Sequence, residues 1–128
     1  TRVAFERFLS NDAPAFVSRP GSSPEVVISL IHRAGGVASL AHPGRTRIDS
    51  RIKPLSLAGL DAIEVYHSDH DQAAIERYHR MASELGLLMT GGSDFHGDPA
   101  HGIEPGASTL PPAEWERLSA ARSRHVVE

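Results

Sequence analysis

Residues 87–97 read Leu-Leu-Met-Thr-Gly-Gly-Ser-Asp-Phe-His-Gly, an apolar run followed by a glycine pair, an acid and a histidine. The run at 87–89 predicts a buried strand that ends at the glycines. In extended chain Asp94 and His96 project to the same side, because they lie two positions apart. A carboxylate and an imidazole at one point are ligands that divalent metals take. We therefore expect a pair of metal ligands where this strand ends.

Two earlier apolar segments also end in histidine. Residues 37–41 predict a strand followed by His42, and residues 60–66 predict a strand followed by His67 and His70. Capping and apolar spacing predict helices between and after the strands, over residues 24–34, 71–85 and 112–122. Short apolar strands that alternate with helices are typical of a parallel sheet covered by helices.

Potential ligands therefore follow all three predicted strands. In parallel α/β folds, the active site is built at the carboxyl ends of the strands. We expect the side chains after residues 41, 66 and 91 to meet at one edge of the sheet.

The remaining segments carry weaker local signals. A short helical pattern lies within residues 1–16, residues 45–53 predict a loop rich in Arg and Ser, and residues 55–58 predict a brief helical turn. On the predicted helices, we expect Trp115 and Leu118 to pack in the core and His32 and His79 to be exposed to solvent.

Composition excludes several kinds of protein. The formal net charge of −3 gives no basic face for nonspecific binding of nucleic acid. The absence of cysteine excludes disulfides and thiolate zinc sites, and it fits the cytoplasm. No apolar run approaches the roughly 18 residues of a membrane span, and Thr1 does not begin a signal peptide.

Length limits how the sheet can close. The 128 residues make one domain at most, and three βα units cannot close a barrel, which needs about 200 residues or more. The chain is therefore either a small open sheet or the C-terminal part of a larger barrel.

Three motifs carry a resemblance to a known family. They are Ala38-Ser39-Leu40-Ala41-His42-Pro43-Gly44, Gly59-Leu60-Asp61-Ala62-Ile63-Glu64-Val65-Tyr66, and Gly91-Gly92-Ser93-Asp94-Phe95-His96-Gly97. In order and spacing they resemble the PHP (polymerase and histidinol phosphatase) superfamily of metal-dependent phosphoesterases, in the branch that acts on nucleotides or trims RNA ends. The resemblance covers nearly the whole chain.

The resemblance implies a distorted seven-stranded α/β barrel with two or three metals. It implies that His42, Asp94 and His96 are metal ligands, with Asp94 and His96 at the catalytic centre. The other ligands of that family come from an N-terminal part that opens with a His-x-His pair, which this sequence lacks. The chain thus resembles the C-terminal part alone.

This interpretation divides the chain into two parts. Residues 1–22 are expected to be the end of a helical insertion and a linker, and residues 23–128 the C-terminal part of the barrel, with three parallel βα units. We expect the isolated chain to bind metal weakly, to be inactive by itself, and to self-associate through open sheet edges. Its missing partner is the N-terminal half of the barrel.

Two further residues are predicted to bind substrate. Arg45 follows His-Pro-Gly and can hold a phosphate with its planar donor fork, although an exposed loop arginine is the alternative. His70 lies beside two aspartates at a helix start, where capping is the alternative. Glu64 and His67 are expected to support the site if they face it.

The predicted function is metal-dependent hydrolysis of phosphomonoesters on nucleotides or RNA 5′ ends. The metal supplies an activated water and compensates the phosphoryl charge; manganese is expected, with zinc, iron or magnesium as alternatives. Two other functions stay open. One is an amidohydrolase that acts on C–N bonds, and the other is a non-catalytic remnant with a binding role.

Overall fold

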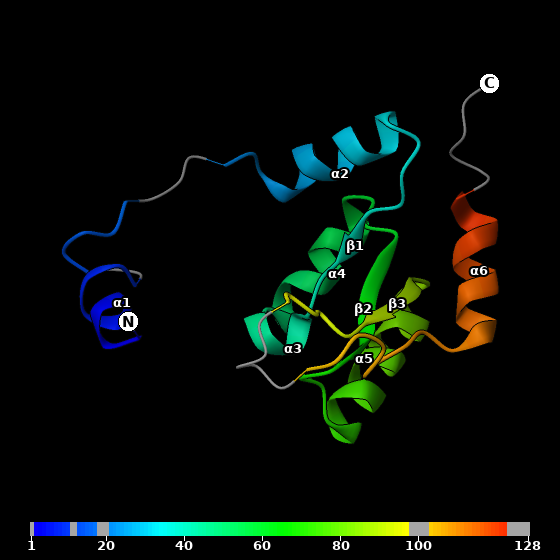
Figure 1. Ribbon diagram of the computed structural model, residues 1–128. Helices are drawn as coiled ribbons and strands as arrows, with labels where there is room; N and C mark the ends of the chain where they lie inside the picture. The colour runs from blue at the N-terminus through cyan, green and yellow to red at the C-terminus, as the bar shows by residue number, and fades with distance from the viewer. Residues whose placement is uncertain (1, 11–12, 18–20, 98–102, 123–128) are drawn as a thin grey trace.

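A computed structural model describes residues 2–10, 13–17, 21–97 and 103–122. The elements follow one another along the chain (Figure 1) as α1 (Arg2–Phe8), α2 (Pro24–Arg33), β1 (Ser39–Leu40), α3 (Pro43–Thr46), α4 (Asp49–Leu57), β2 (Ala62–His67), α5 (Gln72–Leu85), β3 (Leu88–Gly92) and α6 (Pro112–Arg122). None of the helices in the described ranges is both long and apolar enough to cross a membrane.

The three strands form one parallel sheet in the order β1-β2-β3. This confirms the predicted parallel α/β arrangement, while closure into a seven-stranded barrel stays a prediction. The register shifts between Glu64 and Tyr66 of β2. A side chain at Gly91 would place its Cβ 2.6 Å from the Cβ of Tyr66, so glycine is required where the two strands approach each other here.

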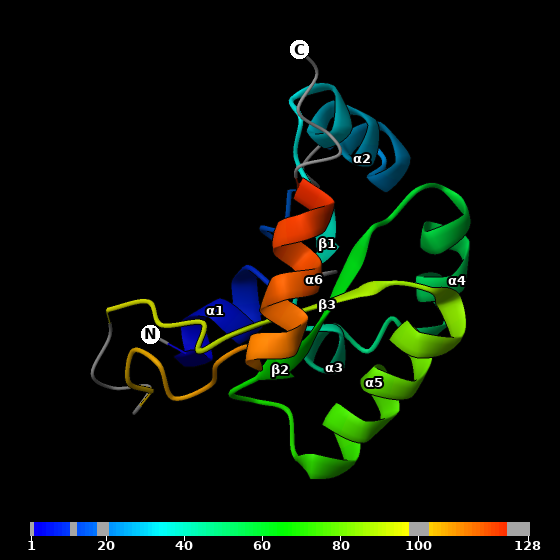
Figure 2. The ribbon, with the colours of Figure 1, turned by 90° about the vertical axis from the view of Figure 1, so that its right-hand side faces the viewer.

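Helices lie on both sides of the sheet. Figure 2 shows α4 and α5 on one side and α6 on the other. Ile63 and Val65 alternate along β2 and are fully buried, with Met89 of β3 beside them in the core. The side chains that α4 and α5 add to this core are Ile52, Leu55, Tyr78 and Ala82. Glu64, between the two buried strand residues, projects to the opposite face.

The three predicted helices begin and end within one residue of their predicted bounds. The Ser23 hydroxyl accepts a hydrogen bond from Val26 N at 3.5 Å and Pro24 opens α2. The Asp71 carboxylate accepts from Ala74 N at 2.8 Å at the start of α5. Gly86, with φ of 66°, ends α5 in the left-handed conformation that favours glycine.

Residues 45–53 are mostly helical, so the predicted loop is wrong. They contribute to α3 and to α4, in which Ile52 and Leu55 are buried in the core. The Arg- and Ser-rich composition gives little local signal for this helix. The helix forms because burial of two apolar side chains in the core outweighs weak local preferences.

Two expectations for single side chains are also wrong. Trp115 is 59% exposed, so it is not a core residue in the described chain. His32 is not simply solvated, since its Nε2 lies 2.7 Å from Asp61 Oδ2. His79 is exposed, as predicted.

Candidate active site at the carboxyl end of the sheet

Three predicted site residues meet where the strands end. His42 follows β1, His67 is the last residue of β2, and Asp94 lies two residues after β3. The ring centroids of His42 and His67 are 5.7 Å apart, and His67 Nε2 lies 3.6 Å from Asp94 Oδ2. The parallel topology thus brings side chains together from positions 42, 67 and 94, as the sequence predicts.

Two of these residues have unusual backbone conformations. His42 has φ of 29° and ψ of 59°, and Asp94 has φ of 53°. Residues other than glycine rarely adopt this region, and such residues cluster at functional sites. In both cases the chain turns sharply just after a strand, which directs the side chain away from the path of the strand.

Glu64 holds the first of these turns. Its Oε2 accepts a hydrogen bond from the backbone N–H of His42 at 2.7 Å. The carboxylate therefore has a charge-assisted partner on the face of the sheet opposite the core. The supporting role expected for Glu64 stays a prediction, and this backbone contact to His42 is consistent with it.

His70 packs against α3, the short helix that follows His42, and is only 6% exposed. Its Nδ1–H donates to Val65 O at 2.9 Å, and its Nε2 accepts from Gly44 N at 3.2 Å. A Cβ at position 44 would lie 2.8 Å from the His70 ring, so glycine permits this contact. Both ring nitrogens are engaged with backbone groups, and substrate contact by His70 would require the bond to Gly44 to open.

Arg45 lies on the short helix α3, beside the site. Its side chain is 60% exposed, and its NH1 lies 3.7 Å from Asp94 Oδ2 and 3.8 Å from Asp69 Oδ2. These distances are longer than direct hydrogen bonds. The guanidinium is thus positioned above the Asp94 carboxylate with donors still exposed to incoming groups.

His96 is the most exposed of the predicted ligands, at 73%. Its Nδ1 lies 2.6 Å from the backbone oxygen of Asp94. Because a carbonyl can only accept, Nδ1 carries the hydrogen and Nε2 keeps its lone pair. Metal-binding histidines commonly donate their other N–H to a backbone carbonyl in this way.

Two buried nitrogens lack partners in the described part of the chain. They are His42 Nδ1 and His67 Nε2. Most buried polar atoms in proteins are hydrogen-bonded, so such atoms call for a partner that arrives with a ligand or another segment. Both lie at the same edge of the sheet.

The donor types suit a divalent metal, since imidazole and carboxylate are ligands for zinc, manganese or iron. Within the described ranges, however, no three His, Asp or Glu side chains are grouped so that they could hold a metal ion. The predicted set of His42, Asp94 and His96 therefore stays a prediction.

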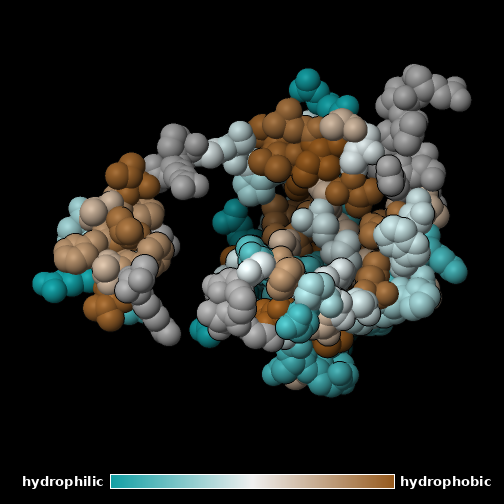
Figure 3. Space-filling view, viewed as in Figure 1, coloured by the Kyte–Doolittle hydropathy of each residue, from teal (hydrophilic) through white to brown (hydrophobic). Residues whose placement is uncertain are grey.

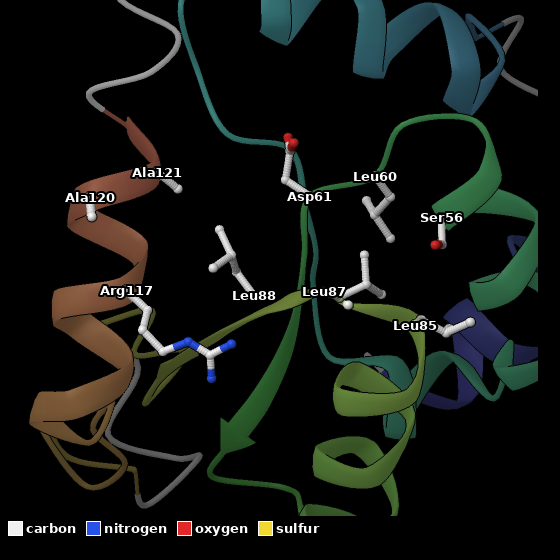
Figure 4. Close-up of a pocket in the computed structure, with 10 residues that line it drawn as sticks. Ser56, Leu60, Asp61, Leu85, Leu87, Leu88, Arg117, Ala120 and Ala121 are labelled. Carbon is white, nitrogen blue, oxygen red and sulfur yellow. The ribbon is translucent and has the colours of Figure 1, made fainter.

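A pocket of about 590 Å³ lies at the other end of the sheet. Figure 4 shows side chains that line it, among them Leu60 and Leu88 near the strand starts and Arg117 from α6. Its carboxylate, Asp61, is already engaged, because Oδ2 accepts from Ala38 N at 2.7 Å and pairs with His32. This pocket is separate from the predicted site.

The histidines and the aspartate lie at the carboxyl edge of a parallel sheet, where α/β folds build their active sites. No protein-family model matches the chain. The chain is 34% identical over 128 residues to a 3′,5′-nucleoside bisphosphate phosphatase from Chromobacterium violaceum, which covers 93% of the chain and 45% of that protein. It is 30% identical over 117 residues to the 5′-3′ exoribonuclease Rnm of Escherichia coli, covering 88% of the chain and 40% of that protein.

Two solved structures are also similar. One is described as an amidohydrolase from Chromobacterium violaceum with bound sulfate and no metal, with a TM-score of 0.74 and 33% identity over 94% of this chain. The other, assigned as a metal-dependent phosphoesterase from Bifidobacterium adolescentis, has a TM-score of 0.74 and 29% identity over 94% of this chain. The chain spans 44% of each of these structures.

The chain is homologous to PHP-type proteins, among them the phosphatase and the exoribonuclease described above. It matches their C-terminal portion and spans less than half the length of each relative described above. The resemblance carried by the three sequence motifs is therefore confirmed.

Proposed function

We propose that the protein containing this chain is a metal-dependent phosphoesterase that removes phosphate from nucleotides or RNA 5′ ends. The observation that carries the proposal is the meeting of His42, His67 and Asp94 at one sheet edge beneath Arg45. Similarity to a nucleoside bisphosphate phosphatase and to a 5′-3′ exoribonuclease supports the substrate class.

His42, Asp94 and His96 would hold the metal, and Asp94 and His96 form the catalytic centre. A bound divalent metal supplies an activated water and compensates charge on the phosphoryl oxygens. His96 offers Nε2 because its Nδ1–H is committed to the Asp94 carbonyl. Glu64 keeps His42 in its turn.

Arg45 and His70 are the residues that we propose to bind the substrate. The exposed guanidinium of Arg45 can donate two parallel hydrogen bonds to a phosphoryl oxygen pair. His70 fixes α3, the short helix that carries Arg45, through its bond with Gly44, and would reach substrate only if that bond opens.

Manganese is the metal we expect, with zinc, iron or magnesium as alternatives, because mixed imidazole and carboxylate ligands suit several of them. The metal dependence stated for the Bifidobacterium relative supports a divalent ion without selecting among them. The lack of cysteine favours a cytoplasmic location.

An upstream part of the protein is proposed to complete the barrel and the ligand set. Figure 3 shows a hydrophobic area over α2, where Val26, Val27 and Leu30 are between 42% and 49% exposed. Covering such side chains is favourable at about 25 cal/mol per Å² of apolar area. Without that part, we expect weak metal binding and self-association of the isolated chain.

An amidohydrolase is the second candidate, favoured by the description of one solved relative. The sulfate bound in that relative is a tetrahedral dianion like phosphate, which makes phosphate esters the better first substrates. A direct comparison of phosphate monoesters with cyclic amides separates the two chemistries.

The test is phosphate release by the full-length gene product from nucleoside bisphosphates and from short 5′-phosphorylated RNA, with and without Mn²⁺. We expect metal-dependent release that Asp94→Asn abolishes and that Glu84→Gln, at an exposed position on α5, leaves unchanged. A folded protein that releases no phosphate from any of these substrates would contradict the phosphoesterase and favour a binding role.

A further inference from the structure

His67 has no part in the reaction proposed above, although its side chain is completely buried in the middle of the site. Its ring lies 5.7 Å from that of His42 and 5.3 Å from that of His70. Its Nε2 has no hydrogen-bond partner among the described residues. A polar atom buried so deeply without a partner points to a contact that forms when the site is complete.

The hydrogen-bond pattern determines which nitrogen of His67 carries the hydrogen. The backbone N–H of Asp69 donates to His67 Nδ1 at 3.0 Å. Because this N–H can only donate, Nδ1 holds a lone pair, and the neutral ring carries its hydrogen on Nε2. A nitrogen that carries hydrogen does not ligate a metal. The buried Nε2–H of His67 is therefore a donor, and the described residues supply no acceptor within hydrogen-bond distance.

The nearest charged acceptor is Asp94. Oδ2 of Asp94 lies 3.6 Å from His67 Nε2 and 3.7 Å from Arg45 NH1, so one buried and one exposed donor face the same oxygen. Oδ1 lies instead 3.7 Å from His96 Nδ1. The two oxygens of this carboxylate thus have different surroundings.

We propose that His67 is the positioning residue for Asp94. Its Nε2–H donates to Oδ2 in the assembled site, which holds the carboxylate in one rotamer and leaves Oδ1 as the oxygen for the metal. The inference rests on the proposed function, in which Asp94 is a ligand. Hydrogen-bond partners of ligating carboxylates are worth about 10- to 100-fold in metal affinity or activity.

The experiment measures Mn²⁺ affinity of the full-length protein by isothermal titration calorimetry, independently of catalysis. His67→Leu fills the space without a donor, and His67→Gln keeps an N–H at similar reach. We expect His67→Leu to weaken Mn²⁺ binding by about 10- to 100-fold and His67→Gln to retain most of the affinity. His79→Gln, at an exposed site on α5, is the matched histidine control and should change nothing.

A double-mutant cycle shows whether His67 acts through Asp94. If it does, His67→Leu has no further effect on Mn²⁺ affinity in an Asp94→Asn background. Unchanged affinity in folded His67→Leu protein, or an equal loss in both backgrounds, would overturn the proposal. A ring hydrogen found on Nδ1 by ¹⁵N NMR would also overturn it.

Failure of the broader function has a different signature. If Asp94 is not a metal ligand, phosphate release is absent and Asp94→Asn leaves Mn²⁺ affinity unchanged, and the positioning role falls with it. If only the role of His67 is wrong, Asp94→Asn weakens Mn²⁺ binding while His67→Leu does not.

Discussion

A histidine–aspartate pair lies at each end of β2, and the two pairs differ in whether their polar side-chain atoms are hydrogen-bonded. At the amino end, His32 Nε2 lies 2.7 Å from Asp61 Oδ2, which also accepts from Ala38 N at 2.7 Å. At the carboxyl end, His67 Nε2 and Asp94 Oδ2 are 3.6 Å apart, and the histidine nitrogen has no hydrogen bond in the described structure.

The comparison distinguishes a hydrogen-bonded pair from one whose buried nitrogen has no hydrogen bond among the described residues. Bonded groups at the amino end tie α2 and the start of β1 to β2, which contributes to stability. A buried donor without a hydrogen-bond partner lowers the stability of the folded state by about 1–3 kcal/mol. The carboxyl end of β2 is therefore locally destabilised in this chain. Such a cost is typical of sites that await a ligand.

The largest expected effect tests the carboxyl-end pair. Asp94→Asn removes the charge that a metal requires, so phosphate release by the full-length protein should fall by more than about 100-fold. This loss exceeds the roughly 10- to 100-fold that is typical when a hydrogen-bond partner of a metal ligand is removed. Stability should change little, because among the described residues this carboxylate makes no short side-chain hydrogen bond. Steady-state kinetics and thermal unfolding check the two halves of this prediction, and a large loss of stability would place Asp94 with the hydrogen-bonded pair at the amino end.

The reverse pattern is expected at the amino-end pair. Asp61→Ala leaves the N–H of buried Ala38 without its acceptor, which should lower the free energy of unfolding by about 2 kcal/mol. Urea unfolding measures this change. The catalytic rate per folded molecule should stay the same, and a specific loss of rate would show that the two ends are coupled. Asp61→Asn, which keeps an acceptor oxygen, should cost less.

A smaller effect on stability is expected from His67→Leu. This change removes the unpaired buried donor and leaves the part-buried backbone N–H of Asp69 without its bond to the ring. The free energy of unfolding should therefore stay within about 1 kcal/mol of the original value, while Mn²⁺ affinity falls. Urea unfolding that shows a loss as large as that of Asp61→Ala would make His67 a structural residue.

The smallest effect concerns pH, through Tyr78 behind the site. Burial raises the pKa of the Tyr78 hydroxyl, and its hydrogen bond to Asp49 adds to the shift. The folded state then holds this proton more tightly than the unfolded state. The contribution to stability is present below the ordinary tyrosine pKa of 10.0 and is lost as pH rises through the higher folded pKa. Tyr78→Phe should reduce the fall in thermal stability above that pH, and an unchanged profile would contradict this.

The sequence by itself determined the parallel strands, the helix caps and the edge where the site forms. These depend on short-range signals: apolar runs of a few residues, a Ser or Asp just before a helix, and Gly86 as a helix end. The structure selects Ser23 over Ser22 and Asp71 over Asp69 as the caps. Because parallel strands all present their carboxyl ends at one edge, the meeting of positions 42, 67 and 94 also follows from chain order.

Tertiary structure alone decided the details that separate the two pairs. His32 and Asp61 are 29 residues apart, and the packing that brings them together leaves no local pattern in the chain. The helix at Asp49–Leu57 likewise depends on burial of Ile52 and Leu55 against distant residues. The hydrogen on His67 Nε2 follows from one backbone contact with Asp69, which exists only once the turn after β2 has formed.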